Sequence, residues 1–132
     1  MKAFLLIIAV GVCFLSCKKG EPVSPGLFGK WELRRMYGGL WWRDSTYKPG
    51  NGTVYQFNSD STFKHFVKGE LTETGVFHIK KDVYDGGGGT KYDALIFNSA
   101  TFGEMVILAG TKLTIGNTWT DNIANDYVKI SD

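Results

Sequence analysis

The feature that most constrains the fold is a set of eight short runs in which apolar and polar residues alternate. In the first run, Trp31, Leu33 and Tyr37 are expected to share one face, and Lys30 lies on the other. A period of two is the pattern of a half-buried strand, and no segment shows a helical period over three turns. The eight runs are Gly29–Tyr37, Thr53–Phe57, Thr62–Val67, Leu71–Lys80, Lys91–Phe97, Glu104–Ala109, Lys112–Ile115 and Asp126–Ile130.

The segments between these runs have the chemistry of turns. Asn58-Ser59-Asp60-Ser61 is a typical turn sequence, and Gly110-Thr111 predicts a tight hairpin. The segment Asp82–Thr90 contains four consecutive glycines and is expected to be a loose loop. Short turns between successive strands indicate an antiparallel meander, and a meander of eight strands removes its exposed edges by closing into a barrel. The expected fold is therefore all-β, an eight-stranded antiparallel up-and-down barrel.

The N-terminus has the pattern of an export signal. A basic start, Met1-Lys2, precedes the uncharged apolar run Ala3–Leu15, which is shorter than the roughly 20 residues a membrane-spanning helix needs. The run ends at Ser16-Cys17, which resembles a lipobox. We therefore expect residues 1–16 to be a lipoprotein signal peptide and Cys17 to be acylated, with palmitate as an expected chain. An ordinary secretory signal or an uncleaved anchor are the alternatives.

This processing has consequences for the mature chain. Residues 17–27 are expected to form a lipidated tether, because two prolines and two glycines oppose regular structure there, and residues 28–132 form the domain. Cleavage before Cys17 leaves one acylated cysteine and therefore no disulfide. Lys18 after the cysteine favours the outer membrane of the cell envelope. The charges are scattered, with a net charge of +2 for the whole chain, so we expect no nucleic acid partner, and a monomer.

Three segments resemble a known family. Gly29-Lys30-Trp31 resembles the G-x-W signature of lipocalins and their calycin relatives. The segments Tyr55–Phe63 and Glu73–Phe77 are similar to the short lipocalin-like lipoproteins of Bacteroidetes-type bacteria. The resemblance covers residues 28–130, and Ser61 departs from the turn glycine that is common there. It implies an eight-stranded up-and-down barrel and fixes no ligand.

An up-and-down barrel would bring three tryptophans to one mouth. Loops alternate between the two ends, so the loop 38–52, with Trp41 and Trp42, lies beside the loop 116–125, with Trp119. Large aromatic side chains at a barrel opening suit ligand contact or a lid. The alternatives are that they cap the core, or that they contact a partner or a membrane surface.

The alternation also predicts which side chains point into the barrel. A barrel of eight strands is just wide enough to be filled by side chains or to hold one small ligand. With so many aromatic residues inside, a filled or narrow interior is an alternative to an open one. The expected inward residues are Leu33, Tyr55, Phe57, Phe63, His65, Phe77 and Ile79, and all of them except Leu33 and Ile79 are candidate ligand contacts together with the three tryptophans.

The sequence contains few patterns that are typical of catalysis or metal binding. His65 is expected to face the core and to be hydrogen-bonded, and His78 to face outward, so no His-pair metal site is evident. Glu70 and Glu73 are expected at a turn and on the strand exterior, on opposite faces. Gly86–Gly89 lacks the Lys-Ser/Thr of a phosphate-binding loop. We expect no catalytic residues, no metal and no cofactor.

Two functions remain in view, and an enzyme is a third alternative that no sequence pattern supports. The first is a membrane-anchored lipocalin-like lipoprotein that binds a small apolar or amphipathic molecule in the cell envelope. The second is an envelope interaction module with a filled barrel, which contacts a protein or glycan through its loop tryptophans.

At the other end of the barrel, Lys129 in the last strand is expected to pack over Trp31 in the first.

Overall fold

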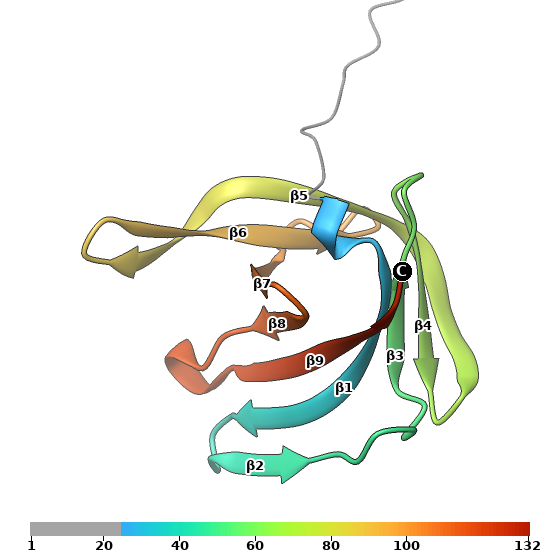
Figure 1. Cartoon of the computed structure of the whole chain (residues 1–132). Coiled ribbons are helices and arrows are strands. Elements are labelled where there is room, and N and C mark those ends of the chain that lie inside the picture. The colour runs from blue at the N-terminus through green and yellow to red at the C-terminus, as the bar shows by residue number, and fades with distance from the viewer. Residues whose placement is uncertain (1–24) are drawn as a thin grey trace, which may run out of the picture.

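The alternating runs form the strands of one antiparallel sheet in the computed structural model, which describes residues 25–132 (Figure 1). Each expected run appears as a strand, and one further strand, β2, is added. The strands are β1 Gly29–Gly38, β2 Arg43–Thr46, β3 Val54–Phe57, β4 Thr62–Val67, β5 Glu70–Gly87, β6 Thr90–Phe97, β7 Glu104–Ala109, β8 Lys112–Gly116 and β9 Ile123–Ser131. Two short 3₁₀ turns complete the fold, η1 at Pro25–Leu27 and η2 at Trp119–Asp121.

The sheet closes on itself because the last strand pairs with the first. β9 runs antiparallel to β1 along the length of β1, with Leu33 opposite Tyr127 and Gly38 opposite Ile123. From β3 onward each strand pairs with the next in sequence, as in a meander. The expected closed eight-stranded antiparallel barrel is therefore confirmed, and β2 is an addition to it.

Strand β2 lies in the segment 38–52, which was expected to be a loop. It pairs with the second half of β1, Arg35–Gly38. The first half of the same edge of β1, Gly29–Glu32, pairs with β3. A turn at Gly38-Gly39, where both residues have positive φ, reverses the chain. The Arg35 guanidinium then donates two hydrogen bonds to the Asp44 carboxylate, at 2.9 and 2.7 Å. An exposed polar strand of this kind has no apolar alternation to reveal it.

A β-bulge in β1 corrects the expected face of Tyr37. The pairing of β1 with β9 shifts between Leu33 and Arg35, so one extra residue is inserted and the alternation changes phase. Met36 consequently lines the barrel interior. Arg35 and Tyr37 point outward together, with the guanidinium carbon 4.4 Å from the ring centroid.

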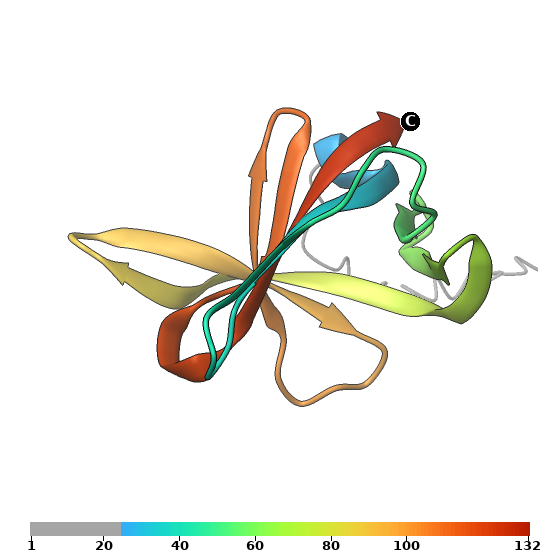
Figure 2. The same ribbon diagram turned by 90° about the horizontal axis from the view of Figure 1, so that it is seen from below.

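The expected loose loop at Asp82–Thr90 is also wrong. β5 continues to Gly87 and pairs with β6, and the turn is confined to Gly88-Gly89 (Figures 1 and 2). Tyr84 pairs with Tyr92, and this cross-strand aromatic pair supports strand structure despite the glycines. The resulting β5–β6 hairpin projects sideways beyond the barrel wall.

The end of the barrel near η1 and the C-terminus, which we call the base, is closed around Trp31. This side chain is fully buried, and its Nε1 donates a 2.7 Å hydrogen bond to the carbonyl of Leu27 in η1. Lys129 Nζ lies 5.7 Å from the ring centroid, so the expected packing of Lys129 over Trp31 is confirmed. Because Leu27 is itself buried, the folded part extends back to Pro25, slightly before the expected boundary at residue 28.

Aromatic side chains fill the interior next to the base. The expected inward positions are confirmed: Phe57, Phe63 and Phe77 are buried, and Leu33 and Ile79 are buried with them. Phe57 meets Phe77 edge to face, with ring centroids 5.0 Å apart. This half of the barrel is solid, so any ligand space lies toward the other end.

The expected signal at residues 1–16, Cys17 and most of the expected tether lie outside the described residues. Within residues 25–132, no helix is long and apolar enough to cross a membrane.

Candidate functional site

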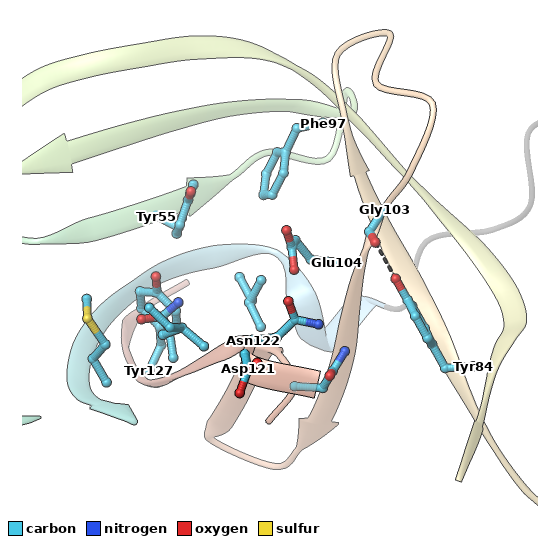
Figure 3. A pocket seen from close by; sticks show the side chains of 13 residues that line it. Tyr55, Tyr84, Phe97, Gly103, Glu104, Asp121, Asn122 and Tyr127 are labelled. Carbon is cyan, nitrogen blue, oxygen red and sulfur yellow. Dashed lines mark hydrogen bonds between the residues drawn. The ribbon is translucent and has the colours of Figure 1, made fainter. Parts of the chain in front are cut away.

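The end of the barrel opposite the base, which we call the mouth, contains an open cavity of about 720 Å³ (Figure 3). This volume is in the range of small-molecule sites. The cavity lies above the aromatic core and is open on one side to solvent. The residues that line it are Met36, Tyr55, Tyr84, Phe97, Gly103, Glu104, Ile115, Asn117, Asp121, Asn122, Ile123, Asn125 and Tyr127.

The inner wall of the cavity comes from alternate residues of the barrel strands. Tyr55 of β3 stacks on Phe97 of β6, with centroids 5.4 Å apart, and meets Tyr127 of β9 edge to face at 5.6 Å. Met36 joins this wall only because the bulge in β1 turns it inward. The wall therefore offers a ligand several aromatic faces held by regular strands.

The rim of the cavity is polar and comes from the connection between β8 and β9. Asn117 is buried, and its side-chain oxygen accepts a 2.9 Å hydrogen bond from the amide of Trp119. Asp121 and Asn122 follow on the same connection and face the cavity (Figure 3). Tyr84 approaches from the β5–β6 hairpin, and its hydroxyl donates to the carbonyl of Gly103.

Two tyrosine hydroxyls in the cavity have no hydrogen-bond partner among the described residues. Tyr127 is only 5% exposed, and no buried polar side-chain atom of residues 25–132 is left unsatisfied, so its hydroxyl opens into the cavity. Burial raises the pKa of Tyr55 to about 12, and Glu73 and Glu104 add to the shift. Burial also raises the pKa of Tyr127. Both hydroxyls thus keep their protons at neutral pH and can donate to a ligand.

The formal charge of the cavity is negative. Glu104 of β7 and Asp121 line it, and no lysine or arginine does so among the described residues. The carboxylate of Glu104 points between the aromatic wall and the polar rim (Figure 3). The cavity thus combines aromatic faces, hydroxyl donors, amide groups and two carboxylates.

The three expected loop tryptophans do not line this cavity. Trp41 and Trp42 are 81% and 77% exposed on the turn between β1 and β2. Trp119 packs instead against Tyr84 and Tyr92 of the β5–β6 hairpin, with ring centroids 6.4 Å away in each case.

The two loops that carry these tryptophans are nevertheless adjacent, as the barrel topology required. The amide of Gly39 donates a 2.8 Å hydrogen bond to the carbonyl of Asn122. A second hollow of about 170 Å³ lies between the loops, with Trp42 and Thr118 in its lining.

The expected strand contacts divide into one cavity residue and its supports. Tyr55 lines the cavity, whereas Phe57, Phe63 and Phe77 lie in the solid core. His65 stacks on Tyr55 at a centroid distance of 4.1 Å and does not line the cavity. Burial lowers the pKa of His65, and Glu73 opposes this effect. The imidazole makes no hydrogen bond to any described residue, so the expected hydrogen bond is absent and the ring acts as packing.

Glu73 is not on the face that the sequence suggested. It lies directly opposite His65 in the β4–β5 pairing, and the two residues therefore share the inward face. His78, by contrast, is exposed as expected. Within residues 25–132, no group of three His, Cys, Asp or Glu side chains is arranged to hold a metal ion.

Several cavity residues were not among the sequence candidates. Glu104 is the clearest case, because alternation along its strand places it on the same face as Val106 and Leu108. A charged residue at the end of an apolar face is a signal for a polar opening. Alternation along its strand could also have indicated Tyr127. The rim residues Asn117, Asp121 and Asn122 lie in the connection between β8 and β9, where the sequence shows no alternation of apolar and polar residues.

Comparisons with protein families, with curated proteins and with solved structures returned no match for this chain. Its fold and its cavity describe a closed antiparallel barrel with an open cavity of about 720 Å³ at one end.

Proposed function

We propose that this protein binds a small amphipathic molecule in the mouth of its barrel, as a lipid-anchored, lipocalin-like protein of the cell envelope. The observation that carries the proposal is the hydroxyl of Tyr127, which has no partner among the described residues and opens, beside aromatic faces, into a cavity of about 720 Å³. A hydroxyl that opens into a cavity without a protein partner is available to donate a hydrogen bond to a ligand or to accept one from it. The mixed lining favours a molecule with both apolar and polar parts over a purely apolar one.

The position of η1, the first described element, supports this arrangement. η1 packs at the base, and the polar connection between β8 and β9 lies at the other end (Figure 2). Between Cys17 and η1 the chain can span at most roughly 25–30 Å. In a lipoprotein anchored at Cys17, the base would thus face the membrane and the mouth would face the aqueous compartment.

A direct test is to titrate the full-length chain with a fatty acid, an isoprenoid alcohol and a retinoid, read by tryptophan emission. Trp119 lies against the hairpin at the rim, so an occupant of the cavity should change its emission. Saturable binding of at least one probe with a polar head supports the proposal. Flat titrations with all three, in a protein whose thermal melt is cooperative, would contradict it.

Tyr127→Phe tests the residue that carries the proposal. We expect the free energy of unfolding to change by less than about 1 kcal/mol, because the lost hydroxyl has no protein partner. Binding of the best probe should weaken about tenfold, because its hydrogen bond to the hydroxyl is lost. Chemical denaturation and the same titration measure the two effects. A large loss of stability with unchanged binding would show that the hydroxyl serves the fold alone.

The alternative function is an interaction module, and one observation favours it. Leu40, Trp41 and Trp42 are consecutive, and each is more than half exposed on the turn between β1 and β2. Exposed tryptophans are frequent where proteins contact partners or glycans. In the orientation proposed above, this turn points away from the membrane, so a partner or glycan fits better than the bilayer.

Replacing Trp41 and Trp42 together with serine separates the two functions. Both side chains are exposed, so the free energy of unfolding should change by no more than about 0.5 kcal/mol. Neither lines the large cavity, so probe binding should persist. If the interaction function holds, binding to a panel of defined envelope glycans or proteins should disappear in this variant. Loss of probe binding with an unchanged melt would instead return these tryptophans to the ligand site.

A further inference from the structure

We propose that the ligand of the mouth cavity carries a cationic amine, which pairs with Glu104 while its apolar part lies against Tyr55 and Phe97. This inference rests on the proposed binding function and specifies the chemical class of the ligand. It concerns charge selection, a property that the shape of the cavity alone does not determine.

The charge of the cavity lining is unbalanced. Glu104 and Asp121 face the cavity, and none of the described lining residues carries a positive charge. The ion pairs of the described residues lie elsewhere: Arg34–Glu32, Arg35–Asp44, Lys81–Asp93, Lys91–Asp85 and Lys129–Asp132. Glu104 and Asp121 therefore have no basic partner among the described residues, and they lie together in the lining of one cavity.

The hydroxyl of Tyr127 is a second polar feature of the cavity, separate from the carboxylates. Tyr127 is nine-tenths buried, and its hydroxyl opens into the cavity without a protein partner. The raised pKa values of Tyr55 and Tyr127 keep both hydroxyls neutral, so they do not repel a ligand and add no second anion. A hydroxyl oxygen can also accept a hydrogen bond from an ammonium group.

The aromatic wall of the cavity suits the apolar part of the proposed amine. The rings of Tyr55 and Phe97 are stacked 5.4 Å apart, and Tyr127 stands edge-on to Tyr55. The faces of such rings attract cations and also cover alkyl or aryl groups. Carboxylate, hydroxyl and aromatic faces together select a cationic head on an apolar body. They disfavour a fatty acid, whose carboxylate would meet Glu104 and Asp121 without compensation.

The experiment compares three ligands that share one chain and differ in the head group: octylamine, octanol and octanoate. Each is titrated into the full-length chain by calorimetry at neutral pH. Octylamine should bind at least about tenfold more tightly than octanol, because a charge-assisted hydrogen bond replaces a neutral one. Octanoate should not bind measurably. Raising the salt concentration should reduce the preference for the amine.

Glu104→Gln should remove the preference, so that octylamine and octanol bind with similar affinity. The matched control is Glu70→Gln, which removes the same charge at the exposed start of β5, outside the cavity lining, and should keep the wild-type preference. Equal loss in both variants would mean that only the net charge matters, which would overturn the inference.

The outcomes separate this inference from the binding function on which it rests. Octanol and octanoate binding as well as octylamine would overturn the amine while keeping a ligand-binding cavity. Binding of a neutral disaccharide in place of octylamine would do the same and assign the polar rim to a sugar. No binding of any head group would overturn both.

Discussion

Replacing Trp31 with alanine is expected to lower the free energy of unfolding by about 3–5 kcal/mol, a large part of the stability of a domain of this size. The side chain is fully buried at the base, and its removal leaves a cavity that rigid strands cannot refill. The change also deprives the Leu27 carbonyl of its 2.7 Å hydrogen bond from the indole. Urea denaturation followed by circular dichroism measures the loss.

Two control variants divide this effect into its parts. Trp31→Phe keeps most of the ring volume and loses the hydrogen bond, so it should cost clearly less than the alanine variant. Lys129→Met keeps the apolar stem over the ring and removes the ammonium, which should cost about 0.5–1 kcal/mol. A cost for Trp31→Ala below about 1 kcal/mol would contradict the central place of this residue in the base.

The strand order and the closure of the barrel could be predicted from alternation because burial of one face imposes a period of two. The same reasoning failed at Tyr37, since a bulge after Leu33 inserts one residue and reverses the phase of the remaining strand. It also missed β2, whose four residues are all exposed and carry no apolar pattern. Pattern reasoning detects burial, so an exposed strand held by backbone pairing and by the Arg35–Asp44 ion pair escapes it.

The candidate site was predictable only in part. Tyr55 was expected to face the interior and does line the cavity, but the sequence could not show where filled core gives way to open space. That transition depends on how the rings of Phe57 and Phe63 stack below it, which is a matter of three-dimensional packing. The tryptophans at the mouth were placed at the right end, yet their side chains turn to the hairpin or to solvent.

The largest effect on location is expected from Cys17→Ala, which should move the protein from the membrane fraction to the soluble fraction almost completely. The reason is the size of the anchor: two acyl chains hold a protein on a bilayer stably, whereas a chain without them has no comparable attachment. The expected signal at residues 1–16 ends at Ser16-Cys17, which is where the expected acyl chains would be attached. Fractionation after a high-salt wash, with immunodetection, measures the shift.

Cys13→Ala is the matched control, because it removes the other cysteine from within the apolar run and should leave the protein in the membrane fraction. Mass spectrometry of the wild-type chain should find Cys17 as the first residue, carrying acyl chains. Wild-type protein found in the membrane with residues 1–16 intact and Cys17 unmodified would identify the apolar run as an uncleaved anchor. Unmodified wild-type protein cut at another site would indicate an ordinary secretory signal, and the barrel would then act free of the membrane.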